Sequence, residues 1–195
     1  MKEVRTEKAT VDFETELKPE TDLERKLLRQ PDFRQGLLWG VPRYGHPEGE
    51  IYKHVKEVLS NIDCLDIDAL DRQRLRLVAY AHDTFKYRED KSTPRDWSKH
   101  HSIYARNFLE NFTDDPIVLD ITELHDEAYY VWRTMYLYHR PQKGAIRLQS
   151  LLDRVEENIQ LYYLFFKCDT LTGDKNLAPL RWFEQHIQGI EIKKI

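Results

Sequence analysis

The sequence is poor in cysteine, and neither of its two cysteines indicates a disulfide. Cys64 and Cys168 lie far apart, show no CxxC spacing, and each stands in an apolar run. Disulfide frameworks and cysteine metal sites usually show even numbers of cysteines at recognisable spacings. We therefore expect two reduced thiols in a cytoplasmic protein rather than a secreted, disulfide-stabilised one.

Long apolar runs are absent as well. No run reaches the roughly 20 residues needed to cross a bilayer, and the charged start MKEVRTEK lacks the apolar core of a signal peptide. The formal net charge of −4 gives no overall attraction to nucleic acid or to an anionic membrane. We expect no membrane partner and no extended nucleic-acid surface, so any phosphate binding is local. The oligomeric state is not predicted.

The length and composition allow one hydrophobic core. The chain has 195 residues, of which 41% are hydrophobic, enough for a single domain. We expect that domain over residues 21–187, a polar N-terminal arm over residues 1–20 that is extended or frayed, and a tail over residues 188–195. Strand-like alternation is lacking outside the tail, and no internal repeat is present. The predicted fold class is all-α, a compact globule of roughly seven to nine helices.

Apolar residues recur at helical spacing along most of the chain, and capping residues mark several helix starts. Thr21 or Asp22 is suited to cap the first helix, and Pro116 follows two acidic residues at the start of another. The glycine- and proline-rich segment at 41–50 is predicted to be a loop, and so is the charged segment at 86–96. Helices are expected at residues 21–28, 33–39, 50–62, 66–83, 97–112, 114–139, 145–172 and 177–186.

Ionisable residues repeatedly share the apolar faces of these helices. In LRLVAYAHDTFK, the spacing places Leu75, Val78 and His82 on one face, and Asp83 follows at once. Burying an imidazole and a carboxylate is costly unless a cation compensates, and a divalent metal ion is the usual one. A single histidine of this kind is more often a hydrogen-bonded core residue than a ligand, but here the feature recurs on five helices. The residues concerned are His54, His82, His101 and His125, with Asp169 on the fifth helix.

The order of these residues resembles that of the HD superfamily of metal-dependent phosphohydrolases, from about residue 46 to residue 173. The matching segments are YKHVKEVL, AHDTFK, HHSIYARNFL, ITELHDE and FKCDTLTG. A bare HD dipeptide carries no information, so the resemblance rests on the ordered set. It implies an all-α core that binds one or two divalent cations through His54, His82, Asp83, His101, His125 and Asp169.

The sequence departs from two subgroups of that superfamily. Cyclic-dinucleotide phosphodiesterases carry HHE and a G-Y-P signature, whereas this chain has HDE at 125–127 and no such signature. Hydrolases of the guanosine alarmone carry HDxxED, whereas this chain has HDTFK. Neither substrate is therefore expected. The resemblance also favours His101 over His100 as the ligand, which leaves His100 as either a surface residue or a substrate contact.

The number of cations is open at this point. If His101 and His125 are ligands, Asp83 bridges two cations, which is the arrangement we favour. If they are not, one cation is bound and the two histidines face the phosphate or the leaving group. Mixed imidazole and carboxylate ligands suit Mn, Fe, Co, Ni or Zn better than Mg or Ca.

The expected reaction is hydrolysis of a phosphate ester by water that the cations activate. Asp83, as the bridging ligand, and Lys86, which would stabilise the phosphoryl charge, are the catalytic candidates. Lys86 is otherwise a solvated lysine beside a charged loop. An aromatic stripe around residues 129–136 is either a stacking wall for a base or part of the core. Further substrate-binding candidates, each otherwise a surface charge, are Arg43, Arg133 and Arg140.

A nucleotide or another small phosphorylated metabolite is the expected substrate. Two other functions remain open. Myo-inositol oxygenase and its relatives place a di-iron centre on the same ligand set, so oxygen-dependent turnover and iron content would identify an oxygenase. A non-catalytic module that senses a nucleotide would bind it without releasing phosphate.

Overall fold

A computed structural model describes residues 11–195 of the protein, and residues 1–10 of the expected arm lie outside the described residues. This part of the chain contains helices and loops and no named strand, which confirms the all-α prediction. None of its helices is long and apolar enough to cross a membrane. The α-helices are α1 (Phe13–Leu17), α2 (Asp22–Leu28), α3 (Pro31–Leu37), α4 (Ile51–Asp63), α5 (Ala69–Ala81), α6 (His101–Leu109), α7 (Pro116–Leu124), α8 (Glu127–Trp132), α9 (Pro141–Val155), α10 (Ile159–Thr170) and α11 (Ala178–His186).

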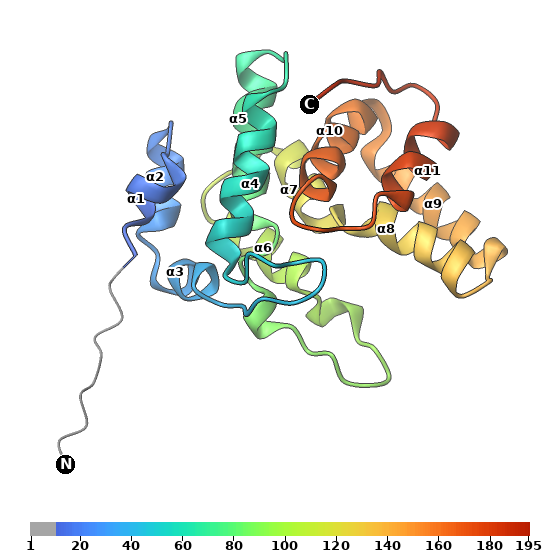
Figure 1. Ribbon diagram of the computed structural model, residues 1–195, viewed down its shortest axis with the longest axis horizontal. Coiled ribbons are helices and arrows are strands. Elements are labelled where there is room, and N and C mark those ends of the chain that lie inside the picture. The colour runs from blue at the N-terminus through green and yellow to red at the C-terminus, as the bar shows by residue number, and fades with distance from the viewer. Residues whose placement is uncertain (1–10) are drawn as a thin grey trace.

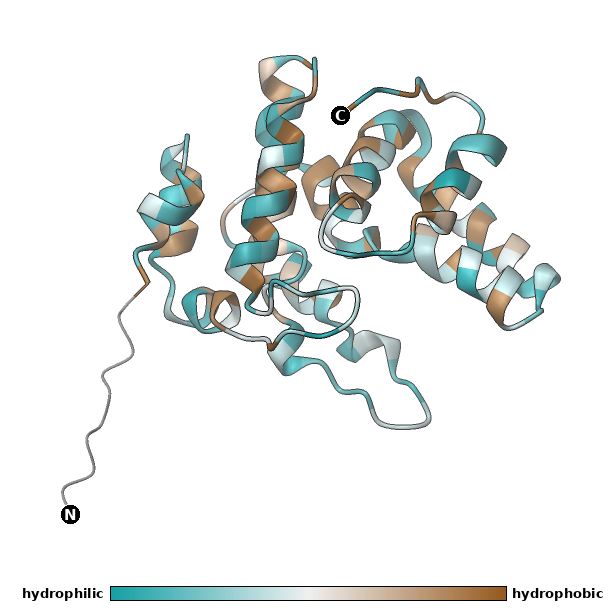
Figure 2. Ribbon diagram, in the orientation of Figure 1, coloured by the Kyte–Doolittle hydropathy of each residue, from teal (hydrophilic) through white to brown (hydrophobic). Residues whose placement is uncertain are grey.

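Helices α4 and α5 stand at the middle of the molecule, with α1 to α3 on one side and α8 to α11 on the other (Figure 1). Apolar residues gather on the faces that the helices turn towards one another, and polar residues cover the outer faces (Figure 2). The buried apolar side chains form a continuous cluster. The two halves of the chain therefore share one core, and α4 and α5 run through it.

The segment just after residue 10 differs from the expectation. Residues 13–17 form α1 instead of an extended or frayed arm, because the Asp12 carboxylate accepts hydrogen bonds from the first N–H groups of the helix. Phe13 and Leu17 are buried, and α1 packs on α4. The prediction of an arm was therefore wrong for residues 13–17. By contrast, Thr21 caps α2 as expected, with a capping box to Glu24.

Close packing fixes the segment that follows α5. Gly36 on α3 lies so near this segment that an added Cβ would be 1.8 Å from the carbonyl oxygen of Thr84. Phe85 packs on Phe108, with ring centroids 5.0 Å apart, and Phe33 stacks on Phe108 at 5.5 Å. These contacts hold α3, α6 and the residues after α5 together, and they leave little freedom for Asp83, which lies directly before Thr84.

The helix expected over residues 114–139 is broken into α7 and α8 at His125 and Asp126. In an unbroken helix the N–H of Ala128 would donate to the carbonyl of Leu124. Here it donates to the hydroxyl of Tyr162 (3.0 Å), which in turn donates to Leu124 (3.0 Å). The tyrosine hydroxyl is inserted into the hydrogen-bond ladder, a known cause of helix kinks. After α8 the chain continues as a π-helical turn, η3 (Arg133–Leu137).

The helix expected over residues 145–172 is also divided. Pro141 occupies the first position of α9, so this helix begins earlier than predicted. It ends where Glu156 has a positive φ of 33°, and a short 3-10 turn, η4 (Glu156–Asn158), leads into α10. The last helix, α11, lies where it was expected. In the tail, the backbone of Glu191 exchanges two hydrogen bonds with the side chain of Gln160.

Candidate metal centre

Side chains from five separate helical segments converge in the interior of the molecule. Apart from Asp169, whose side chain is 15% exposed, all are nearly completely buried. The structure therefore brings together the whole set of predicted ligands. They are His54 on α4, His82 at the end of α5, Asp83 next to it, His101 at the start of α6, His125 at the end of α7 and Asp169 on α10.

A first cluster forms between α4, α5 and α10. The Nε2 atoms of His54 and His82 are 3.2 Å apart, and Asp169 Oδ1 lies 2.9 Å and 3.6 Å from them. Asp83 Oδ2 lies 3.7 Å from His54 Nε2 and 3.6 Å from His82 Nε2. Ligands bound at about 2.1 Å to one ion are separated by about 3.0–3.4 Å. The cluster is therefore close to the size that a transition-metal ion requires.

A second cluster lies on the other side of Asp83. Its Oδ1 atom is 3.2 Å from His101 Nε2 and 3.4 Å from His125 Nε2, and these two nitrogens are 3.3 Å apart. Asp83 thus directs one carboxylate oxygen to each cluster. Within the described residues, Asp83 Oδ1 is buried and has no hydrogen-bond partner. Because an unpaired buried carboxylate oxygen is costly, a cation between these three residues fits the site.

Each of the four histidines turns Nε2 to the centre and Nδ1 away from it. His82 Nδ1 donates to the carbonyl of Ala79 (3.0 Å), and His125 Nδ1 donates to the carbonyl of Thr122 (2.9 Å). The other two face carboxylates, since His54 Nδ1 lies 3.6 Å from Glu48 Oε1 and His101 Nδ1 lies 3.5 Å from Glu89 Oε1. Outer partners of this kind orient imidazole ligands in metalloproteins.

The ionisation of the cluster residues also suits cation binding. Burial would raise the pKa of Asp83, but the charges of Lys86 and His82 hold it well below its ordinary value. Burial, aided by Lys175, lowers the pKa of His54 to about 4, so its ring is neutral at pH 7. Burial would also lower the pKa of His125, yet the neighbouring carboxylates of Asp126 and Asp83 raise it to about 9. The carboxylates therefore favour positive charge at the centre.

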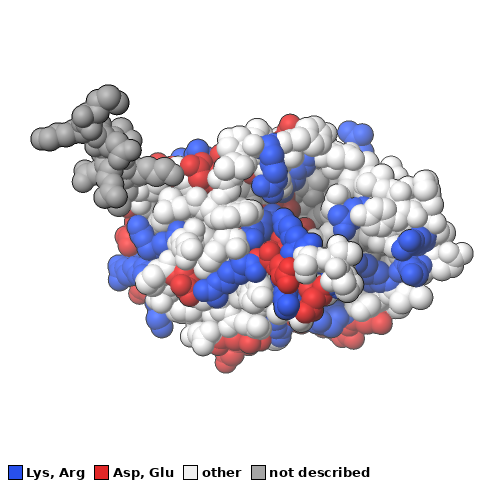
Figure 3. Space-filling view, turned by 90° about the horizontal axis from the view of Figure 1, so that it is seen from below, with Lys and Arg blue, Asp and Glu red and all other residues white. Residues whose placement is uncertain are grey.

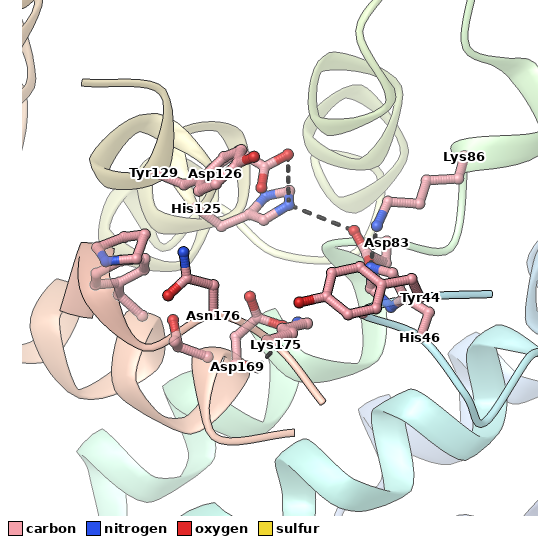
Figure 4. A pocket seen from close by; sticks show the side chains of 14 residues that line it. Tyr44, His46, Asp83, Lys86, His125, Asp126, Tyr129, Asp169, Lys175 and Asn176 are labelled. Atoms are coloured by element: carbon pink, nitrogen blue, oxygen red, sulfur yellow. Dashed lines mark hydrogen bonds and ion pairs between the residues drawn. The ribbon is translucent and has the colours of Figure 1, made fainter. Parts of the chain in front are cut away.

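A pocket of about 310 Å³ opens onto both clusters. Asp83, His125 and Asp169 reach its wall, and Lys86, Lys175 and Tyr129 lie around it (Figure 4). On the face of the molecule seen in Figure 3, Lys and Arg side chains gather near the middle and alternate with Asp and Glu. The pocket thus offers two acidic ligand groups and two ammonium groups to whatever enters it.

Of the four basic residues predicted to bind substrate, one lines the pocket and three do not. Lys86 lines the pocket and contacts Asp83 Oδ2, as the prediction of a catalytic role requires. Arg43 and Arg140 are exposed and are not among the residues that line the pocket. Arg133 does not line it either, because its guanidinium packs on Tyr130, 4.6 Å from the ring centroid.

His100 lies behind the second cluster. It is 4% exposed, so the interpretation as a surface residue was wrong, and it does not line the pocket. Its ring packs on His101 with centroids 4.1 Å apart, and its Nε2 is 2.9 Å from the Tyr130 hydroxyl. The choice of His101 as the residue that faces Asp83 agrees with this geometry.

Two further residues of the site were missed by the sequence analysis. Asp126 Oδ2 lies 3.5 Å from His101 Nε2 and 3.6 Å from His125 Nε2, at the pocket wall. A signal for it exists, because residues 125–126 repeat the His-Asp pair of residues 82–83. Lys175, from the loop after α10, also reaches the pocket. No sequence pattern marks it.

Comparison with known proteins adds one match. The sequence pattern of the HD domain family matches residues 51–158. That range contains four histidines and one aspartate of the two clusters and ends before Asp169. No curated protein and no solved structure matches the chain.

Proposed function

Because the chain belongs to the HD domain family, we propose that it is a metal-dependent phosphohydrolase acting on a small phosphorylated compound such as a nucleotide. The observation that carries this proposal is the position of Asp83. Its two carboxylate oxygens face two different pairs of histidines at the floor of one pocket. This is the arrangement that a pair of bridged cations needs.

Divalent cations held there supply the acidity that makes water a nucleophile at neutral pH and the charge that neutralises phosphoryl oxygens. The six ligand residues hold and space them, as predicted from the sequence. Lys86 and Lys175 add positive charge to the lining of the pocket, where it favours an anionic phosphoryl group. Burial would raise the pKa of Asp126, but the charges of His125 and His101 lower it, so this carboxylate is ionised and is placed to accept a proton.

The pocket favours a small substrate. At about 310 Å³ it lies at the lower end of the range for small-molecule sites. Tyr129 and Phe166 give it an aromatic part beside the charged one. A compact substrate such as a nucleotide matches this pocket, because its phosphate suits the charged part and its base suits the aromatic part.

The test is a screen for phosphate release. The protein is loaded separately with Mn, Fe, Co, Ni and Zn and is assayed on phosphate monoesters, diesters and nucleotides. We expect release from at least one class, and none from the Asp83→Asn variant treated identically. Failure of every loaded form on every class would contradict the proposal.

A di-iron oxygenase is the second candidate, favoured by the four imidazoles that accompany the bridging carboxylate, a ligand set that suits iron as well. Oxygen consumption by the iron-loaded protein, with no phosphate release, would support it. Nucleotide binding without any turnover would instead support a sensing module.

A further inference from the structure

Two lysines approach the first cluster from opposite parts of the chain. Lys86 follows Asp83 by three residues, at the start of the short 3-10 helix η1 (Lys86–Arg88), and its Nζ contacts Asp83 Oδ2. Lys175 lies in the loop after α10, and its Nζ is 2.9 Å from Asp169 Oδ1 and 2.9 Å from the Asp169 carbonyl. Each ammonium group therefore binds one of the two carboxylates of this cluster.

The carboxylate oxygens that these lysines contact are the ones that face the histidines. Asp169 Oδ1 is the atom 2.9 Å from His54 Nε2, and Asp83 Oδ2 is the atom 3.6 Å from His82 Nε2. A cation bound by the first cluster and the two ammonium groups therefore compete for the same negative charge. When the cation binds, the lysine N–H donors lose part of their attraction to Asp83 and Asp169.

Both ammonium groups also face one space. The Lys86 and Lys175 side chains are 14% and 18% exposed, and both line the pocket (Figure 4). Burial lowers the pKa of His46, which also lines the pocket, and the positive charges of Lys86 and Lys175 lower it further. An anion in the pocket can therefore be reached from two sides, and each ammonium has three N–H donors to offer.

We propose that Lys86 and Lys175 together form a receptor for a phosphoryl dianion, and that anion binding is coupled to cation binding at the first cluster. The identity of the anion rests on the proposed function. Cation binding frees the two ammonium groups, and the phosphoryl oxygens then accept their hydrogen bonds. By linkage, each ligand raises the affinity for the other. Lys175, which lies in an irregular loop, is thereby assigned a role in substrate binding.

The test uses Mn²⁺ and inorganic phosphate as probes, measured by titration calorimetry on the full chain. The variants are Lys175→Met, Lys175→Arg and Lys86→Met. The control is Lys56→Met, which removes an exposed lysine whose Nζ is 2.8 Å from Glu16. In the wild type and the control we expect phosphate to strengthen Mn²⁺ binding. In Lys175→Met and in Lys86→Met we expect phosphate binding to the Mn²⁺-loaded protein to weaken about tenfold or more, with Mn²⁺ affinity alone unchanged or higher. Lys175→Arg should stay near the wild type.

Two results would overturn the inference. Unchanged phosphate binding in Lys175→Met would show that Lys175 does not reach the anion. Weaker Mn²⁺ binding without phosphate, in both Lys175→Met and Lys175→Arg, would show that the lysine only positions Asp169. The phosphate-release screen is separate from this test. If the wild type hydrolyses esters but Lys175→Met binds phosphate normally, the proposed function stands and the inference about the two lysines is wrong. If phosphate binding depends on Lys175 but no ester is hydrolysed, the inference stands and the proposed function is wrong.

Discussion

His82 and His125 end two different helices in the same way, and their rings meet with centroids 5.0 Å apart. The Nδ1 of each donates to the carbonyl three residues earlier, and each is followed by an aspartate. The last turn of a helix thus fixes the ring, points its Nε2 inward and places a carboxylate beside it. The same helix-end arrangement, at α5 and again at α7, therefore positions a large part of the candidate metal centre.

The Tyr162 hydroxyl should position the second half of that centre. Tyr162→Phe leaves the N–H of Ala128 and the carbonyl of Leu124 without their bridge, at a cost of about 1–3 kcal/mol. Because this bridge holds the helix open at His125, we expect weaker Mn²⁺ binding at the second cluster as well as a lower free energy of unfolding. Urea unfolding and Mn²⁺ titration measure the two effects.

The matched control is Tyr80→Phe. The Tyr80 hydroxyl is also buried and donates to a backbone carbonyl, that of Leu17, at 2.9 Å. This variant should lose stability and keep its Mn²⁺ affinity. Equal Mn²⁺ affinity in the two variants would show that the Tyr162 hydroxyl does not position the second cluster.

Glu89 should act on the second cluster through His101. Burial would raise the pKa of Glu89, but the nearby His101 ring and the hydrogen bond from Arg95 hold it below its ordinary value, so Glu89 faces His101 Nδ1 as a carboxylate. Glu89→Gln should weaken cation binding by about 10–100-fold, as is typical for such outer partners. Mn²⁺ affinity would be measured beside Glu110→Gln, which changes an exposed acid at the opposite end of α6, where it pairs with Arg106. Equal affinities would contradict the assignment.

Substitution of Lys86 should lower the rate of turnover without lowering cation binding. Its ammonium contacts a ligand carboxylate without being a ligand itself, so Lys86→Ala should keep bound Mn²⁺ and lower kcat/KM by about 10²–10³-fold. The measurement pairs metal analysis of the dialysed protein with the rate on whichever ester the screen identifies. Loss of the metal together with the rate would assign Lys86 to the support of Asp83.

An ion-pair network should make stability depend on pH in the acid range. Burial would raise the pKa of Asp120, but hydrogen bonds from Arg154 on α9 and Arg106 on α6 lower it below its ordinary value. The charged form therefore stabilises the fold above that ordinary value, and the contribution is lost as the pH falls through it towards the lowered folded value. This network joins α6 and α7, which carry His101 and His125.

With chelator present, Asp120→Asn should be about 1 kcal/mol less stable than the wild type at pH 7, and the difference should shrink near pH 3. Urea unfolding at both pH values measures it. Asp153→Asn, at an exposed acid hydrogen-bonded only to Gln149 in the part of the chain described, is the control. A difference for Asp120→Asn that does not change with pH would contradict the prediction.

Helical spacing was enough to predict that His54, His82 and His101 share apolar faces that the fold then buries. The full set of six ligands, with Asp83 and with His101 in place of His100, rested on the resemblance to the HD superfamily and stays a prediction. The break at residues 125–126 was not predictable in this way, since the apolar spacing continues through it. It depends on the hydroxyl of Tyr162, 34 residues after Ala128. The position of Asp126 at the pocket therefore did not follow from the apolar spacing.

The loop residues of the site were also not predicted from the sequence. Lys175 follows Asp169 by six residues in an irregular segment, where no periodicity says which way a side chain points. Its contact with Asp169 exists because the loop turns back over the end of α10. The segment at 41–50 was predicted to be a loop, but the position of its His46 in the lining of the pocket was not predicted.

The central claim is that Asp83 joins two cation sites, and the number of Mn²⁺ ions bound per chain tests it most directly. We expect about two ions in the wild type, about one in His125→Ala, and weak binding at both sites in Asp83→Asn. One ion in the wild type with undiminished binding in Asp83→Asn would contradict it.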